Sequence, residues 1–234
     1  MSYIGVLAVG LIISFYFCYE RRKGFSSDLL ILKTISSLGF LLCGFVAIAL
    51  TFKNGNYSFY GPCILFGGIL GLCGDIFLDL KGVHEEFKDK YMMVGFVSFF
   101  ICHIFYNLAI YKFNGFSLKW IILCIIISLI VAAINISLDK KLQLEYGKYK
   151  FIVFAYSSIL ILTTVSAIFS MILNGYSAAR LLMLIGGVMF ILSDVILSYT
   201  FFKKNCDGES WYIINHLTYY IAQYAIMSSI IFVK

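Results

Sequence analysis

Two aspartates lie inside long apolar stretches of this chain, where carboxyl groups are costly. Asp75 occurs in GGILGLCGDIFLD (67–79) and Asp194 in GGVMFILSDVILS (186–198). A charged side chain at the centre of a bilayer costs at least about 2.5 kcal/mol, so such residues usually serve a function. Two carboxyl groups can perform acid–base chemistry when one is protonated and the other ionised. The sequence therefore predicts that Asp75 and Asp194 belong to a catalytic or transport site.

Further polar side chains lie in the same apolar stretches and could assist these aspartates. His103 and Tyr106 are three residues apart and share a helix face, as do Tyr220 and Gln223. His103 could orient a carboxyl group or relay a proton, although a structural histidine is an equal alternative. The tyrosines could instead serve packing, and Gln223 could instead bond two helices.

Asp79 and Ser193 lie next to the two aspartates in different ways. Asp79 follows Asp75 by one helical turn and is close to the end of its apolar stretch. We interpret Asp79 as a residue at the mouth of the site, where it could meet Lys81 or water. Ser193 could cap or pack, or could orient Asp194 beside it.

The composition favours an all-α integral membrane protein with a single transmembrane domain over 1–234. The chain is 62% hydrophobic and only 13% charged, whereas about 25% is usual in soluble domains. A helix needs about 20 apolar residues to cross a membrane. Eight spans of that kind are predicted, at about 3–19, 30–52, 59–80, 91–111, 119–138, 151–173, 181–202 and 211–233.

The basic residues predict an orientation in the membrane. Thirteen of the 18 lie in alternate loops or beside them: Arg21, Arg22, Lys23, Lys33, Lys81, Lys88, Lys90, Lys140, Lys141, Lys148, Lys150, Lys203 and Lys204. By the positive-inside rule these loops are cytoplasmic and both termini are external. The net charge of +6 then favours membrane lipid as a partner. No basic cluster in a soluble element supports nucleic-acid binding.

An internal repeat relates the two aspartates. Gly67, Gly68 and Asp75 align with Gly186, Gly187 and Asp194 at an offset of four spans. An even number of spans preserves direction across the membrane, so the halves 1–111 and 112–234 would be parallel four-helix repeats. Asp75 and Asp194 would then lie at similar depths and face each other across a pocket.

Metal and cofactor sites are not predicted. The seven cysteines contain no CxxC pair, and no HExxH-like spacing occurs. We read the cysteines as small apolar residues and predict no disulfide framework, no metal and no cofactor. A metal ion held by Asp75, Asp79, Asp194 and His103 is the less favoured alternative.

Four motifs in order give a family resemblance. They are GDIFL (74–78), FVSFFICHIFY (96–106), FILSDVILS (190–198) and YYIAQ (219–223). Together with Lys33 in the second span and Tyr156 in the sixth, they resemble the bacterial YhhN family and its animal relatives, the lysoplasmalogenases. The chain departs from the family at Cys102, where a small Ala is usual, at Asp79, commonly apolar, and at Thr34, commonly Pro.

The resemblance implies a hydrolase that cleaves the vinyl-ether bond of a lysophospholipid, in the plasma membrane of a bacterium. Asp194 would be the acid and Asp75 the base, although the sequence does not order them. Tyr220 and Gln223 would position water or the ether oxygen, and Lys33 would meet the phosphate. A proton-coupled transporter and a non-catalytic lipid-binding protein remain alternatives, and the oligomeric state is left open.

Overall fold

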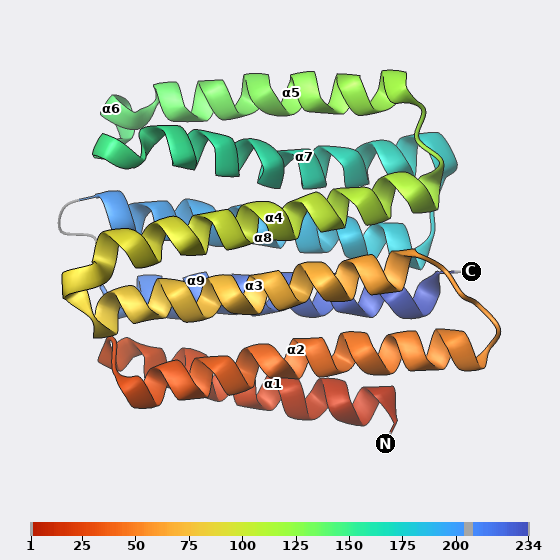
Figure 1. Cartoon of the computed structure of the whole chain (residues 1–234), viewed down its shortest axis with the longest axis horizontal. Helices are drawn as coiled ribbons and strands as arrows, with labels where there is room; N and C mark the ends of the chain where they lie inside the picture. Colours follow the sequence, from red (N-terminus) through yellow and green to blue (C-terminus); the bar gives the residue numbers. More distant parts are fainter. Residues whose placement is uncertain (1, 204–207, 234) are drawn as a thin grey trace.

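A computed structural model describes residues 2–203 and 208–233, so Lys204, Cys206 and Lys234 lie outside the described residues. That part of the chain is helical and contains no strand. Its eight long helices are α1 (Tyr3–Glu20), α2 (Ser27–Lys53), α3 (Tyr60–Val83), α4 (Lys88–Asn114), α5 (Leu118–Ser137), α7 (Lys150–Asn174), α8 (Ala178–Phe202) and α9 (Glu209–Ser229). They run side by side along the long axis of the molecule (Figure 1).

Seven of the eight predicted spans are confirmed as helices long and apolar enough to cross a membrane. The chain is therefore a multi-pass membrane protein. The exception is α9, which falls short because it carries many polar side chains. Most of these are buried, among them Asn215, His216, Tyr219, Tyr220 and Gln223. The polar side chains of α9 are thus accommodated by packing against other helices, and α9 does not need the apolar composition of the other spans.

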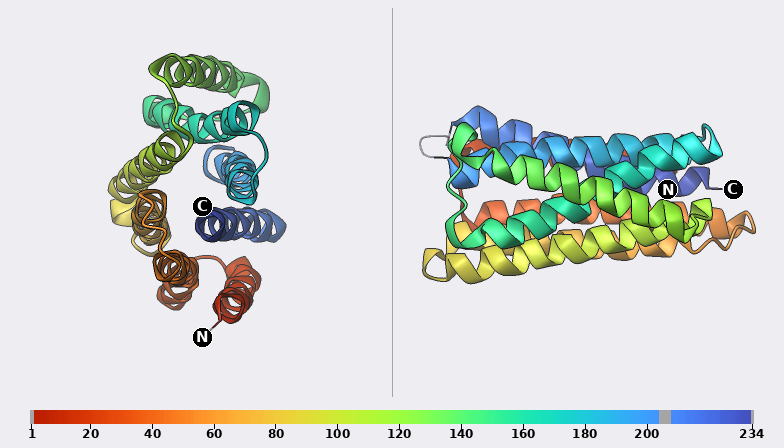
Figure 2. Two further views of the ribbon diagram at one scale, coloured as in Figure 1. Left: turned by 90° about the vertical axis from the view of Figure 1, so that its right-hand side faces the viewer. Right: turned by 90° about the horizontal axis from the view of Figure 1, so that it is seen from above.

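Six helices close a ring. Each packs on the next in the order α2, α3, α4, α7, α8, α9, and α9 packs back on α2. The other two long helices lie outside this ring, α1 against α2 and α9, and α5 against α7. An end-on view shows α8 and α9 on the concave side of a curved row formed by the other helices (Figure 2). The ring encloses the polar residues that the sequence predicts as a site.

Glycines allow the closest helix pairs in the ring. A Cβ on Gly67 would lie 2.6 Å from the Tyr106 ring of α4, and a Cβ on Gly186 would lie 2.4 Å from Ile226 of α9. Without side chains at these positions, α3 approaches α4 and α8 approaches α9 closely. If the two halves are parallel repeats, a two-fold rotation about an axis along the bundle would exchange α2, α3 and α4 with α7, α8 and α9. This relation between the two halves stays a prediction.

A short segment links α5 to α7 at the end of the bundle where α1 and α3 end. It contains the single-turn helix α6 (Asp139–Leu142) and a 3-10 turn (Gly147–Tyr149). Gln143 ends α6 with φ of 59°, a left-handed conformation that turns the chain sharply. The Glu145 amide then donates to the Phe202 carbonyl at 2.8 Å. This bond ties the segment to the end of α8.

Candidate active site

The two aspartates line one pocket inside the helix ring. Its volume is about 40 Å³. It lies in the half of the bundle where α3 and α8 end, because both aspartates fall in the last part of those helices. Its polar lining residues are Arg21, Lys33, Asp75, Asp79, Tyr156, Ser193, Asp194, Thr200, Tyr212, Asn215, His216 and Tyr219.

Asp75 is held by three donors from two helices. Its Oδ2 accepts hydrogen bonds from Ser37 Oγ of α2 and from the Tyr219 hydroxyl of α9, each at 2.7 Å. Its Oδ1 lies 3.3 Å from Lys33 Nζ. The side chain is buried. A buried carboxylate needs such charge and hydrogen-bond compensation, and Asp75 has both.

Asp79 is buried in an ion cluster, so its predicted place at the mouth of the site was wrong. Arg21 donates to both carboxylate oxygens at 2.8 Å, and Lys33 Nζ donates to Oδ1 at 2.9 Å. The prediction failed because Arg21, which directly follows α1, is buried and reaches Asp79 of α3. Lys81 does not pair with Asp79 but lies over the Phe201 ring.

Lys33 lines the pocket, yet it is already engaged. Its ammonium bridges Asp75 and Asp79, and the side chain is buried. The expected contact of Lys33 with a phosphate would need one of these ion pairs to yield. The structure therefore gives Lys33 a first task in compensating two neighbouring carboxylates.

Asp194 has a simpler environment. Its Oδ2 accepts a hydrogen bond from the Tyr156 hydroxyl of α7. Within the described residues, no lysine, arginine or histidine forms an ion pair with it. Ser193 does not orient it, because its hydroxyl donates to the Asn215 carbonyl at 3.1 Å and Asn215 Nδ2 donates to the Ser193 carbonyl at 2.7 Å. Ser193 thus joins α8 to α9.

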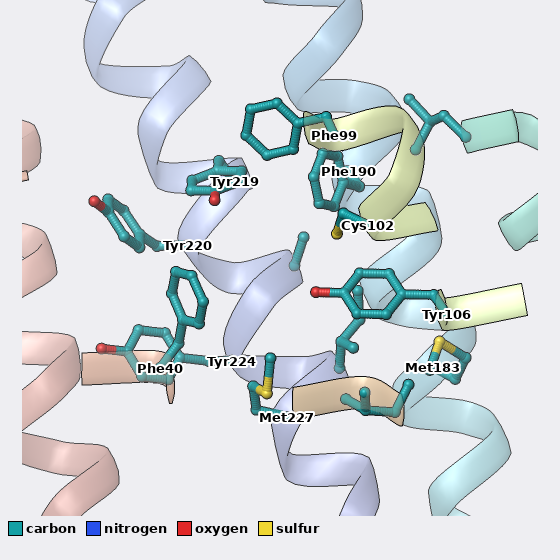
Figure 3. Packing of buried hydrophobic residues seen from close by; sticks show 14 of the residues in the cluster. Phe40, Phe99, Cys102, Tyr106, Met183, Phe190, Tyr219, Tyr220, Tyr224 and Met227 are labelled. Carbon is teal, nitrogen blue, oxygen red and sulfur yellow. The ribbon is translucent and has the colours of Figure 1, made fainter. Parts of the chain in front are cut away.

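A chain of hydrogen bonds supports Asp75 from behind the pocket wall. The Tyr106 hydroxyl donates to Gln223 Oε1 at 2.8 Å, and Gln223 Nε2 donates to the Tyr219 hydroxyl at 3.1 Å. The Tyr219 ring also packs edge-to-face against the rings of both Phe99 and Phe190, as the close view of the core shows (Figure 3). These contacts fix the direction in which Tyr219 donates to Asp75.

The tyrosine on the pocket wall is Tyr219, whereas Tyr220 was named as the site residue from the sequence. The Tyr220 hydroxyl lies 3.3 Å from Ser37 Oγ and 3.4 Å from the Lys33 carbonyl, outside the pocket lining. Tyr106 and Gln223 also lie behind the wall. These three residues position others and do not face the cavity.

His103 is fully buried behind the pocket wall. Its Nδ1 lies 3.0 Å from Thr163 Oγ1, its Nε2 has no hydrogen-bond partner, and its ring packs 4.7 Å from that of Phe190. Neither Asp75 nor Asp194 forms a hydrogen bond with it in the described part of the chain. The predicted catalytic contact of His103 is therefore absent from this site.

Several pocket residues were missed by the sequence analysis. Arg21 was counted only as a loop charge, although its guanidinium lies 4.0 Å from the centre of the Phe25 ring and pairs with Asp79. Asn215 and His216 precede the YYIAQ motif and face the same pocket. Their position one turn before Tyr219 on the same helix is the signal that could have found them.

In residues 2–203 and 208–233, no three His, Cys, Asp or Glu side chains form a group that could hold a metal ion.

The family model described as the YhhN family matches residues 30–230. No curated protein and no solved structure matches the chain.

Proposed function

The chain belongs to the YhhN family, and on this premise we propose that it hydrolyses the vinyl-ether bond of lysoplasmalogens. The products would be a fatty aldehyde and glycerophosphoethanolamine or glycerophosphocholine. The observation that carries the proposal is one pocket on which two of the three lining aspartates have different partners. Asp75 lies beside Lys33, whereas Asp194 forms no ion pair with any described residue.

The different partners suggest different roles. A buried carboxylate is tolerable when a cation and hydrogen-bond donors compensate it, as Lys33, Ser37 and Tyr219 do for Asp75. A carboxyl group with no cation avoids the cost of a buried charge by keeping its proton. We therefore assign Asp194 as the proton donor and Asp75 as the ionised base.

The proposed reaction begins with proton transfer from Asp194 to the second carbon of the alkenyl chain. The electron pair of the double bond forms the new C–H bond, and the first carbon and the ether oxygen share the resulting positive charge. The Asp75 carboxylate stabilises this oxocarbenium ion and takes a proton from water, which adds to the first carbon. The logic resembles the use of two carboxyl groups in glycoside hydrolysis.

The hemiacetal then breaks down to the products. Its hydroxyl proton returns to the Asp194 carboxylate, the carbonyl of the aldehyde forms, and the glycerol oxygen leaves with the proton held by Asp75. Both carboxyl groups are thereby restored to their starting states. Phe96, Phe99 and Phe190 on the pocket wall limit the access of bulk water to the cation.

The protein is also proposed to lie in a bacterial plasma membrane with both termini outside. The described connections within 20–29, 81–90 and 138–150 lie at one end of the bundle, at the left in Figure 1. They carry most of the loop lysines and arginines, which favours a cytoplasmic position for this end. Labelling of single cysteines introduced at Asn56 and Lys140 in intact cells tests this orientation, and labelling of Lys140→Cys alone would contradict it.

Aldehyde release from a 1-alkenyl lysophospholipid tests the proposed function. Purified full-length protein is compared with Asp75→Asn and Asp194→Asn, each expected to lower turnover by about 100-fold or more. Asp89→Asn is the matched control, because Asp89 pairs with Lys148 and Tyr149 away from the pocket. Size-exclusion chromatography and thermal unfolding show whether each variant is folded.

Three outcomes separate the alternatives. No aldehyde from folded wild-type protein would exclude this substrate class. Full activity in both aspartate variants would exclude the assigned roles. Proton-dependent solute flux into liposomes without turnover would support a carrier instead.

A further inference from the structure

A second pocket lies beside the candidate active site, outside the α8 side of the helix ring. It is bounded by α5, α7, α8 and the segment between α5 and α7, and its volume is about 110 Å³, against about 40 Å³ for the first pocket. Most of its lining residues are Leu, Ile, Val, Phe and Tyr, including Leu160, Ile161 and Ile191. It is therefore the larger and the more apolar of the two spaces.

The two pockets share one wall. Phe96, Tyr156, Asp194, Leu197 and Phe201 line both. Arg21, Lys33, Asp75 and Asp79 line only the polar pocket. Asp194 is thus the carboxyl group at the boundary between a charged space and an apolar one.

One end of the apolar pocket is built by the segment between α5 and α7. Leu142, Leu144 and Tyr146 form this end, and the Tyr146 ring packs 5.0 Å from that of Phe202. The backbone bond from Glu145 to Phe202 holds the segment on α8. On another side the pocket reaches Val195, whose side chain is 45% exposed on the outer surface of α8. A hydrocarbon chain can enter there directly from the bilayer.

We propose that this apolar pocket binds the single hydrocarbon chain of the lysophospholipid, with the headgroup in the polar pocket. The inference rests on the proposed function for the identity of the headgroup. An amphiphile bound across the shared wall would place the junction of its polar and apolar parts beside Asp194 and Tyr156. In a lysoplasmalogen that junction is the vinyl ether. The geometry thus selects the bond that meets the proton donor.

Photolabelling tests the position of the chain without requiring turnover. The probe is a 1-alkyl lysophosphoethanolamine with a diazirine near the end of its chain, which cannot be cleaved because it has no double bond to protonate. We expect labelled peptides from α7 and α8 that contain Leu160, Ile161 or Ile191. An excess of unlabelled alkyl lysophospholipid is expected to reduce this labelling, whereas diacyl phosphatidylethanolamine is not. Labelling confined to other surfaces, or equal competition by both lipids, would overturn the proposal.

Two adjacent serines of α7 provide a matched pair for a turnover test. Ser157 and Ser158 both donate to the Phe154 carbonyl, at 3.1 and 2.7 Å. Ser157 lines the apolar pocket, whereas Ser158 lines a separate groove toward α4 and α5. A tryptophan at 157 would fill the pocket, and one at 158 would leave it open.

Ser157→Trp is expected to lower kcat/KM for an 18-carbon chain by about 30-fold, since each methylene that loses burial costs about a factor of four. An eight-carbon chain should lose less than about threefold, because it reaches less far into the pocket. Ser158→Trp should leave kcat/KM unchanged for both the 18-carbon and the eight-carbon substrate. Val195→Trp serves as a second pocket variant if Ser157→Trp does not fold.

The two proposals fail in different ways. Labelling of α7 and α8 by the uncleavable probe, without aldehyde from any vinyl ether, would contradict the reaction and keep the chain site. Aldehyde release with the same chain-length dependence in Ser157→Trp, Val195→Trp and wild type would contradict the chain site and keep the reaction.

Discussion

The segments around Asp75 and Asp194 carry the same residue pattern but have different surroundings. In both, a glycine pair precedes the aspartate by about two turns and brings its helix against the next one. Asp75 faces Lys33, Ser37 and Tyr219, whereas Asp194 faces Tyr156. Equivalent positions thus place two carboxyl groups on one pocket, and the helices opposite them decide which one is compensated by a cation.

The difference between the surroundings of Asp75 and Asp194 comes from the helices that pack beside each repeated segment. On the Asp75 side, Arg21 and Lys33 are brought in by α1 and α2. On the Asp194 side, α5 and α7 contribute no cation to the pocket wall among the residues that the structure describes. An acid and a base can therefore arise from two copies of one motif.

The largest expected effect comes from a substitution that breaks the ion cluster of Arg21, Lys33 and Asp79. Asp79→Asn leaves Arg21 and Lys33 with one fewer buried carboxylate, and we expect a loss of about 3–5 kcal/mol in the free energy of unfolding. Asp194→Asn should lose less than about 1 kcal/mol, because one neutral hydrogen bond replaces another. Unfolding in detergent by increasing SDS measures both. Equal losses of stability in Asp79→Asn and Asp194→Asn would show that the carboxyl groups of Asp79 and Asp194 are not compensated differently.

The tyrosines that donate to the two aspartates should also differ. Tyr156→Phe removes the hydrogen bond to Asp194 and is expected to lower kcat by about 10- to 100-fold. Tyr219→Phe leaves Asp75 with Ser37 and Lys33, so about a threefold loss is expected. Rates of aldehyde release decide this. A larger loss in Tyr219→Phe would reverse our assignment of the more dependent carboxyl group.

The glycine pairs are expected to behave alike. Gly67→Ala would place a methyl group 2.6 Å from Tyr106, and Gly186→Ala would place one 2.4 Å from Ile226. Each should lose about 1–3 kcal/mol of stability through overpacking. Gly5→Ala is the control, since its Cβ would meet only the Ser2 hydroxyl, at 3.3 Å. A loss in one glycine variant alone would show that only one half needs close approach.

The smallest effect concerns the shape of the cation. Arg21→Lys keeps the charge near Asp79 but loses one of two parallel hydrogen bonds, so we expect about 1 kcal/mol of destabilisation. Arg22→Lys is the neighbouring control, because Arg22 bonds to Tyr19 at the surface. The shift in the thermal unfolding midpoint compares the two. Similar shifts would mean that the bidentate geometry adds no stability.

Much of the fold could be predicted because its cause is local. Runs of apolar residues about 20 long specify spanning helices, and seven of the eight predicted spans meet that criterion. The helix α9 departs from it because Asn215, His216 and Gln223 find partners inside the bundle. Hydropathy measures a segment in isolation and does not include such partners.

The site could be predicted only in part, because its contacts join distant residues. The sequence predicts Asp75 and Asp194 on one pocket from the repeated segments, and both line the pocket. The pairing of Arg21 with Asp79 joins residues 58 apart and depends on how far the turn after α1 brings the Arg21 side chain into the bundle. Similarly, the choice between Tyr219 and Tyr220 depends on the rotation of α9, which is fixed by its packing against α8, α2, α1 and α3.

The closure of the ring between α9 and α2 has a consequence for the order of biosynthesis. The helix α9 leaves the ribosome after the other helices of the ring, yet it supplies Tyr219 to Asp75 and closes the ring against α2. Asp75 must therefore enter the membrane with Lys33 and Ser37 as its early partners and wait for its third. The least apolar of the eight long helices and the last hydrogen bond to Asp75 arrive together, so the site matures only once α9 has entered the membrane.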